Sequence, residues 1–139
     1  MIRHGERVFV DTGAWIALAV TADPFHARAV EAWESLLERG ARLTTSVPVV
    51  LETVTFLDRN TTREVALAWK ESLKTLRWFR ILGCTPADLE RAWDYFRRTD
   101  LHKLSAVDAT SFVLMTSYKV RHAFTFDHHF ATVGFRLVG

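Results

Sequence analysis

The sequence of 139 residues contains one cysteine, Cys84, and no long hydrophobic segment. A single cysteine excludes an intrachain disulfide and a cysteine-based zinc site, and it agrees with a reducing, cytoplasmic location. No apolar run approaches the roughly 20 residues that a membrane-spanning helix needs, so we expect no membrane partner. The polar start, residues 1–7, leads into a strand and is not typical of a signal peptide. Repeats, low-complexity tracts and linkers are also missing, which predicts one domain over residues 1–139.

Four acidic residues stand alone in long, largely apolar windows of the sequence. Each is the only Asp, Glu, Lys or Arg in its window, and the windows are residues 8–22, 43–57, 104–118 and 122–135. The four acids are Asp11, Glu52, Asp108 and Asp127. An unpaired carboxylate in apolar surroundings is costly, and no basic residue lies nearby in sequence. A divalent cation would neutralise such acids, so the pattern favours a metal-dependent enzyme.

The charge balance agrees weakly with this interpretation. The chain carries 18 basic and 16 acidic residues, a net charge of +2. With the four lone acids set aside, the remainder carries 18 − 12 = +6. A basic body around an acidic, metal-binding pocket suits a polyanionic substrate, although such a charge spread over a whole surface is unremarkable by itself.

Short β-type runs alternate with helical patterns along the chain. The expected strands cover residues 7–10, 41–45, 79–82, 122–126 and 135–138. The expected helices cover residues 12–20, 25–39, 47–57 and 105–118, two segments that open at Thr61 and Thr85, and a short turn or helix at 127–131. This order predicts an α/β sandwich with a mostly parallel sheet.

The order of the elements also predicts where the acids lie. Ligands of such folds bind beyond the carboxyl ends of the strands. Asp11 and Asp127 each directly follow a strand, Asp108 opens a helix, and Glu52 lies about one turn into another. All four can therefore converge on one edge of the sheet, where a few carboxylates would hold Mg²⁺ or Mn²⁺. Metals at such a site activate water and stabilise the oxygens of a phosphodiester.

Each acid except Glu52 also has a local structural explanation. Asp11 could cap the helix that starts at Thr12, and Asp127 could cap a terminal turn. Asp108 has the spacing of a capping box with Ser105. Capping does not explain a glutamate in the middle of a helical segment among valines.

Several polar residues flank the acids and have two interpretations each. Thr12, Ser105 and Thr125 could orient carboxylates or bind phosphate, or could serve local capping and strand propensity. Asp100 is an acid at the rim of the expected site, with a charged loop as the favoured alternative.

The basic residues near the acids are equally open to two interpretations. His128 and His129 could contact RNA or metal, although a solvent-facing turn is favoured. Arg97, Arg98 and Lys103 could form a phosphate-binding rim, and a solvated helix end explains them about as well. The aromatic residues mostly have helical spacing and are assigned to the core.

Four sequence blocks resemble the PIN-domain ribonucleases, and in particular the VapC-type toxins of prokaryotic toxin–antitoxin pairs. The blocks are VFVDTGAWIAL, PVVLETVTFL, LSAVDATSFVLM and AFTFDHHFATVGF. The resemblance implies a single PIN-like three-layer α/β/α domain. It implies that the four acids are catalytic and bind Mg²⁺ or Mn²⁺, with Thr12, Asp100, Ser105 and Thr125 as supporting positions. An RNA substrate, a homodimer and a cognate antitoxin are further implications.

Three other functions compete with the toxin interpretation. A housekeeping RNA-processing nuclease would use the same acids. A catalytically silent module that only binds RNA or protein would usually have lost one or more of them. Phosphotransfer through Asp11 would need a second aspartate in its loop or a lysine after a strand, and the sequence shows neither.

Overall fold

A five-stranded sheet organises residues 2–139, the part of the chain that the computed structural model describes; Met1, part of the polar start, lies outside it. The strands lie in the order β3-β2-β1-β4-β5, and every neighbouring pair is parallel. The expectation of a mostly parallel sheet is therefore confirmed. The strands are β1 (Arg7–Val10), β2 (Arg42–Ser46), β3 (Phe79–Leu82), β4 (His122–Phe124) and β5 (Arg136–Val138).

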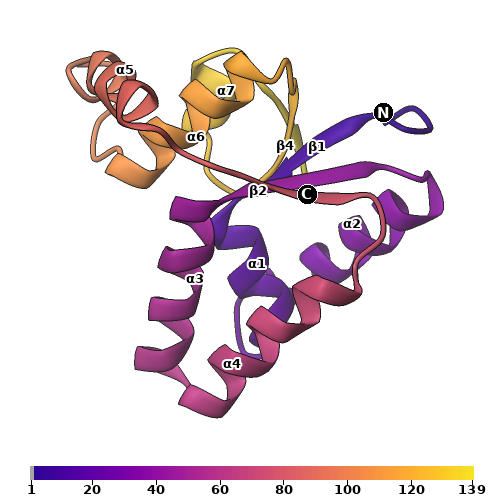
Figure 1. Cartoon of the computed structure of the whole chain (residues 1–139). Coiled ribbons are helices and arrows are strands. Elements are labelled where there is room, and N and C mark those ends of the chain that lie inside the picture. The colour runs from indigo at the N-terminus through magenta and orange to yellow at the C-terminus, as the bar shows by residue number, and fades with distance from the viewer. Residues whose placement is uncertain (1) are drawn as a thin grey trace.

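Helices cover both faces of the sheet and complete the three layers that the resemblance implied (Figure 1). One layer consists of α1 (Thr12–Ala19), α2 (His26–Glu38), α3 (Val47–Asn60) and α4 (Arg63–Ser72), the last followed by the 3₁₀ turn Leu73–Thr75. The other consists of α5 (Pro86–Phe96), α6 (Ala106–Ser117) and α7 (His129–Thr132). Crossovers between parallel strands are right-handed. The chain moves one way along the sheet from β1 to β3 and then the other way to β4 and β5, so the later helices lie on the opposite face from the earlier ones. Among the described residues, no helix is long and apolar enough to cross a membrane.

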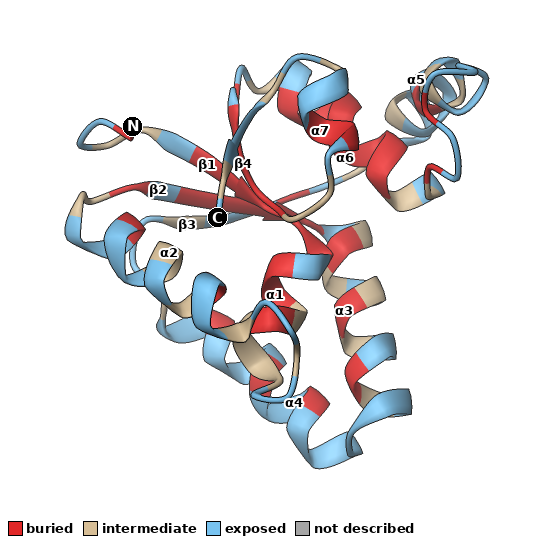
Figure 2. Cartoon of the chain, turned by 180° about the vertical axis from the view of Figure 1, so that it is seen from behind, coloured by how far each residue is buried: buried red, intermediate tan, exposed pale blue. Residues whose placement is uncertain are grey.

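The core lies where the sheet is covered on both faces (Figure 2). Val8, Phe9 and Val10 of β1 are completely buried, as expected for a central parallel strand. Helix α6 is buried at every position from Asp108 to Met115, in agreement with a sequence that is apolar nearly all round. Asp108 is therefore carried into the interior by the most buried helix of the fold.

The chain changes direction at β1, and this creates the crevice that positions the site. From β1 the chain proceeds to β2 and β3, whereas β4 arrives on the other side of β1. Such a reversal of strand order is where open α/β sheets bind ligands. Asp11 follows β1 here, and its backbone N–H donates to the carbonyl of Phe124 at the end of β4, at 3.0 Å.

One expected helix start is wrong by one residue. The hydroxyl of Thr62, not Thr61, accepts the capping hydrogen bond of α4, from the backbone N–H of Val65. The reason is that α3 runs three residues further than expected, to Asn60, so Thr61 donates back to the carbonyl of Leu57 at the end of that helix. The predicted start of α5 at Thr85 is confirmed, and Thr85 forms a reciprocal capping box with Asp88.

Candidate active site at the carboxyl edge of the sheet

A cavity of about 670 Å³ opens at the carboxyl edge of the sheet, and all four lone acids line it. They come from the end of β1, from α3, from α6 and from the loop after β4, as the order of elements predicted. The lining contains no lysine or arginine. The lining acids are Asp11, Asp23, Glu52, Asp108 and Asp127. The site is therefore built from carboxylates that lack a basic counterion within it.

Asp11 is buried and only partly satisfied. Its Oδ2 accepts a hydrogen bond from the hydroxyl of Thr125 at 2.9 Å, while its Oδ1 is buried without a partner. Asp11 occupies the N-cap position of α1 but makes no side-chain capping bond there, so capping does not explain it. Burial raises the pKa of Asp11 to about 7, although the Thr125 hydrogen bond acts in the opposite direction. The unpartnered oxygen is suited to bind a cation.

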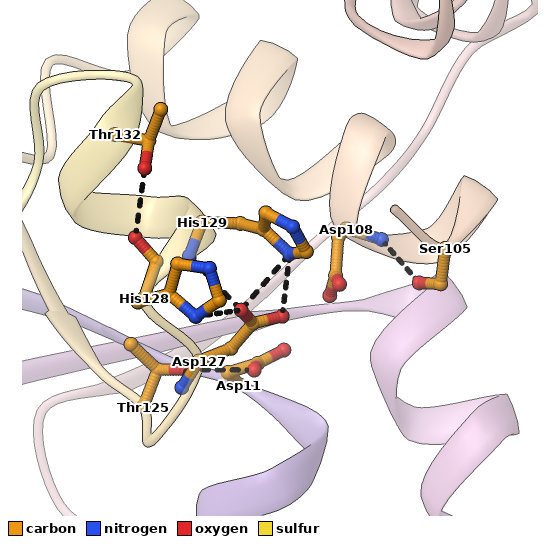
Figure 3. A network of polar contacts seen from close by, with 8 residues as sticks. All are labelled: Asp11, Ser105, Asp108, Thr125, Asp127, His128, His129 and Thr132. Carbon is orange, nitrogen blue, oxygen red and sulfur yellow. Dashed lines mark hydrogen bonds and ion pairs between the residues drawn. The ribbon is translucent and has the colours of Figure 1, made fainter. Parts of the chain in front are cut away.

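Asp108 sits in the first turn of α6, but Ser105 makes the capping contact of that helix. The hydroxyl of Ser105 accepts from the backbone N–H of Asp108 at 3.0 Å. The Asp108 carboxylate instead faces Asp127 and Asp11 (Figure 3). Burial, followed by the neighbouring charges of Asp11 and Asp127, raises the pKa of Asp108 to about 8. A carboxyl group held among like charges in this way has a strong demand for a cation.

Asp127 has both a local and a site-directed role. Its Oδ1 accepts from the backbone N–H of His129 at 2.9 Å, which stabilises the turn before α7. The His129 ring nitrogen Nδ1 lies 3.0 Å from the same oxygen and 3.3 Å from Oδ2. Donor atoms of Asp108, Asp127 and His129 all lie within 4.8 Å of one another.

The two histidines after Asp127 differ from each other. The His128 side chain is 84% exposed, as expected for a turn. The His129 side chain is only 11% exposed and points toward Asp127, so the favoured solvent-facing interpretation is wrong for it (Figure 3). The sequence does not show which of the two adjacent histidines is buried, because the direction of each side chain depends on where α7 begins.

Thr125 connects two of the acids. Its hydroxyl donates to Asp11 and accepts from the backbone N–H of Asp127, at 2.9 and 3.0 Å. The hydroxyl of Thr12 is buried without a partner, and Thr12 lines the cavity together with Ser105. Three of the four expected supporting residues thus lie at the site.

Asp100 is the supporting residue that the structure does not bring to the cavity. Its exposed carboxylate forms a bidentate pair with the Arg98 guanidinium, at 2.9 and 2.6 Å. Arg97 pairs with Asp94 at 3.0 Å, and neither it, Arg98 nor Lys103 lines the cavity. The two arginine–aspartate pairs neutralise their own charges at the end of α5, which is the charged-loop alternative.

Glu52 and three phenylalanines form the outer part of the cavity. Glu52 is half-buried on α3, and its charge contributes to the raised pKa values of Asp11 and Asp108. Phe25, Phe56 and Phe126 line the cavity, although aromatic residues were assigned mostly to the core. Phe25 and Phe126 stack with their ring centroids 4.6 Å apart.

The donor atoms present fit a divalent cation. Carboxylate oxygens with one imidazole are ligands that Mg²⁺ and Mn²⁺ accept, and the buried Oδ1 of Asp11 has no protein partner. The raised pKa values of Asp11 and Asp108 show that the protein alone does not stabilise their charges. The geometry and electrostatics thus define an acidic site built to receive a cation at the switch point of a parallel sheet.

Comparison with known proteins assigns this chain to a family. Residues 8–136 match the PIN domain, so the chain belongs to the PIN-domain family. It is 36% identical over 129 residues to the 23S rRNA-specific endonuclease VapC20 of Mycobacterium tuberculosis, which covers 92% of this chain and 95% of that protein.

Solved structures agree with the assignment. The crystal structure of M. tuberculosis VapC20, described as a sarcin–ricin-loop-cleaving toxin, matches with a TM-score of 0.81 and 33% identity, over 92% of this chain and 95% of that one. VapBC2 of Rickettsia felis, bound to a DNA fragment from its promoter, matches with a TM-score of 0.67 and 12% identity, over 94% and 96%. The second likeness shows the fold alone, whereas the first also supports a VapC-type nuclease.

Proposed function

We propose that this protein is a metal-dependent endoribonuclease that acts as the toxin of a VapBC-type toxin–antitoxin pair. The observation that carries the proposal is the group of four acids around one cavity, with a buried carboxylate oxygen of Asp11 left without a partner. The kinship to VapC20 supports the type of reaction. All four acids are present, which argues against a catalytically silent module.

We assign the cation to Mg²⁺ or Mn²⁺ and its binding to Asp11, Glu52, Asp108 and Asp127. When bound, the metal would supply activation of water and stabilisation of charge on the phosphodiester oxygens. The protein's own residues prepare this site. Thr125 holds Asp11 and the backbone of Asp127 in a fixed relation, and Ser105 fixes the helix end that carries Asp108. Asp11 and Asp108 are themselves buried, which limits competition from water for their carboxylates.

The substrate class that we propose is a structured ribosomal RNA loop. VapC20 is described as specific for 23S rRNA, and this chain covers nearly its whole length. We also propose a cognate antitoxin, because the structural relatives include VapBC complexes, and a cytoplasmic location that gives access to ribosomes. The domain itself is proposed to extend over residues 1–139.

We place a second copy of the chain on an apolar face formed by Val47 and Leu51 of α3 and Leu89 of α5. These side chains are exposed, and Leu51 is 63% exposed. Val47 and Leu89 line a groove together with Val107 of α6, and Leu51 and Val107 line the adjacent one, which reaches Glu52. Burial of such a face is the ordinary driving force of a homodimer.

Cleavage of RNA by the purified, antitoxin-free protein tests the function. We expect discrete products from total ribosomal RNA with Mg²⁺ or Mn²⁺, none with EDTA, and none with Asp11→Asn, whose fold is retained. Full activity of Asp11→Asn would overturn the site assignment. Absence of both cleavage and calorimetric metal binding in the wild type would favour the silent module, and cleavage of precursor RNAs alone would favour a housekeeping role.

A further inference from the structure

The sheet is chemically polarised, because arginines gather at its amino edge, where Glu6 lies beside His122, and the site's acids gather at its carboxyl edge. β1, β2 and β5 begin at Arg7, Arg42 and Arg136, and their side chains are exposed. Arg121 directly precedes β4, and Arg77 lies two residues before β3. The strands have three to five residues, so the two edges lie roughly 10–17 Å apart. The arginines are therefore too far away to neutralise the acids of the site.

One part of the amino edge combines arginine with exposed aromatic surface, and we call it the basic edge. It consists of Arg7, Arg42, Trp78, Arg80 and Tyr118, which line one concave surface. The Arg42 guanidinium lies 5.9 Å from the Trp78 ring centroid, and the Arg80 guanidinium lies 5.1 Å from that of Tyr118. Arg7 donates to the backbone carbonyl of Tyr118 at 3.0 Å. No acidic side chain lines this surface.

These arginines differ from the four arginines of the molecule that are held in ion pairs. Arg63, Arg91, Arg97 and Arg98 each form an ion pair with an aspartate. Among the described residues, none of the three basic-edge arginines has such a carboxylate partner. Guanidinium groups that stack on aromatic rings and keep free N–H donors are suited to bind phosphate.

Trp78 is the second, independent observation at this surface. Its side chain is 68% exposed, which is unusual for a residue that normally anchors a core. Its backbone has φ +55°, in the left-handed region that bulky residues rarely adopt. Strain of this kind persists where function needs it, and an exposed indole offers a flat face for a base.

We infer that the basic edge is a second RNA-binding surface, at which Arg42 and Arg80 contact phosphates and Trp78 stacks on an unpaired base. The choice of RNA as the ligand rests on the proposed function. The surface lies at the opposite end of the sheet from the acids, so it would hold a segment of a large folded RNA away from the cleaved bond. It would raise affinity for long substrates without changing the chemistry of cleavage.

Binding of RNA to protein that cannot cleave tests the inference. Fluorescence anisotropy would measure the Kd of the Asp11→Asn protein, in EDTA, for a fluorescein-labelled RNA hairpin with a single-stranded extension. The other variants are made in this Asp11→Asn background. Trp78→Gly relieves the backbone strain and removes the ring, and we expect the Kd to rise about tenfold. Trp78→Phe keeps a ring and should bind nearly as the parent does. Unchanged affinity of Trp78→Gly would overturn the stacking role.

The salt dependence of binding tests the phosphate contacts. The double variant Arg42→Ala/Arg80→Ala should lower the slope of log K against log salt by about 1.4, since each lost contact to a single strand removes about 0.7. Arg63→Ala/Arg97→Ala removes the same charge from paired, exposed arginines and should leave the slope unchanged. Equal losses in both double variants would mean general attraction only and would overturn the inference. If the Arg42→Ala/Arg80→Ala variant lost binding to polyglutamate but bound RNA normally, the surface would instead be assigned to an acidic protein partner.

Failure of this inference is distinguishable from failure of the proposed function. If the wild type cleaves RNA and the basic-edge variants bind normally, the nuclease assignment stands and the second surface is refuted. If the wild type never cleaves but the variants lose RNA affinity, the surface stands and the enzyme assignment fails.

Discussion

At the scale of single residues, the buried carboxyl group of Asp11 links the site to protein stability. Its pKa rises from the ordinary value of 3.8 to about 7. Between these values the folded state holds more protons than the unfolded chain, so the free energy of unfolding falls as the pH rises. The loss is about 1.4 kcal/mol for each pH unit over which one group stays protonated in the folded protein alone.

We therefore expect the metal-free protein to be more stable toward denaturant at pH 5 than at pH 8. Asp11→Asn should reduce this dependence without abolishing it, because it removes one of two titrating groups and keeps the side-chain shape, while Asp108 still has a raised pKa. Asp58→Asn, at a partly exposed residue of α3 that pairs with Arg63, serves as the control and should keep the wild-type trend. Added Mg²⁺ should stabilise more at pH 8, where the carboxyls are free to bind it. Rising stability of the metal-free wild type between pH 5 and 8 would contradict the raised pKa.

His129 supplies a second residue-scale prediction with its own control beside it. His129→Ala should weaken Mn²⁺ binding by about tenfold, whether the imidazole ligates the metal or orients Asp127. His128→Ala changes an exposed neighbour that lines the cavity but lies 3.9 Å from Asp127, and it should have a clearly smaller effect. Calorimetric titration of both variants measures this, and equal affinities would remove His129 from the site.

Some residues of the site were predictable from the sequence and others were not. The four acids of the cavity were predictable, because an acid that is alone in an apolar window is recognisable in the sequence. The burial of His129 and the distance of Asp100 from the cavity were not predictable in this way. They depend on the start of α7 and on the ion pair with Arg98, which are decided by tertiary packing.

At the scale of elements, the N-cap of α6 couples helix stability to the site. Ser105→Ala removes the hydroxyl that accepts from the Asp108 backbone and should cost about 1 kcal/mol. Thr62→Ala removes the corresponding cap of α4, a helix that carries none of the four acids, at a similar cost. Denaturant unfolding should show both losses, while only Ser105→Ala should also lower cleavage. Equal cleavage rates in the two variants would show that the cap does not position Asp108.

Most elements were predictable because their signals are local. Thr85 with Pro86 marked the start of α5, and the apolar surface of α6 marked its central place. The start of α4 was missed because two threonines stand together, and only the true length of α3 decides which of them caps. The spatial order of strands also lies beyond local signals, since it depends on pairing between distant segments.

At the scale of the whole molecule, the proposed dimer makes a prediction about the apolar face on α3 and α5. Exposed Leu51 lines a groove that reaches Glu52, so Leu51→Glu should convert a dimer into a monomer in light-scattering measurements. Helix α4 also exposes an apolar side chain, Leu67, away from this face. Leu67→Glu is the matched control and should leave the dimer intact. A monomeric wild type would remove the proposal.

The hydrogen bond between Thr125 and Asp11 joins positions 114 residues apart in the chain. During translation, Asp11 therefore emerges 114 residues before Thr125. The contacts that hold Asp11 beside Asp127 form only after β4 has been made and has paired with β1. A nascent chain that stops short of β4 therefore lacks this arrangement, although Asp11 and the rest of β1 are already present.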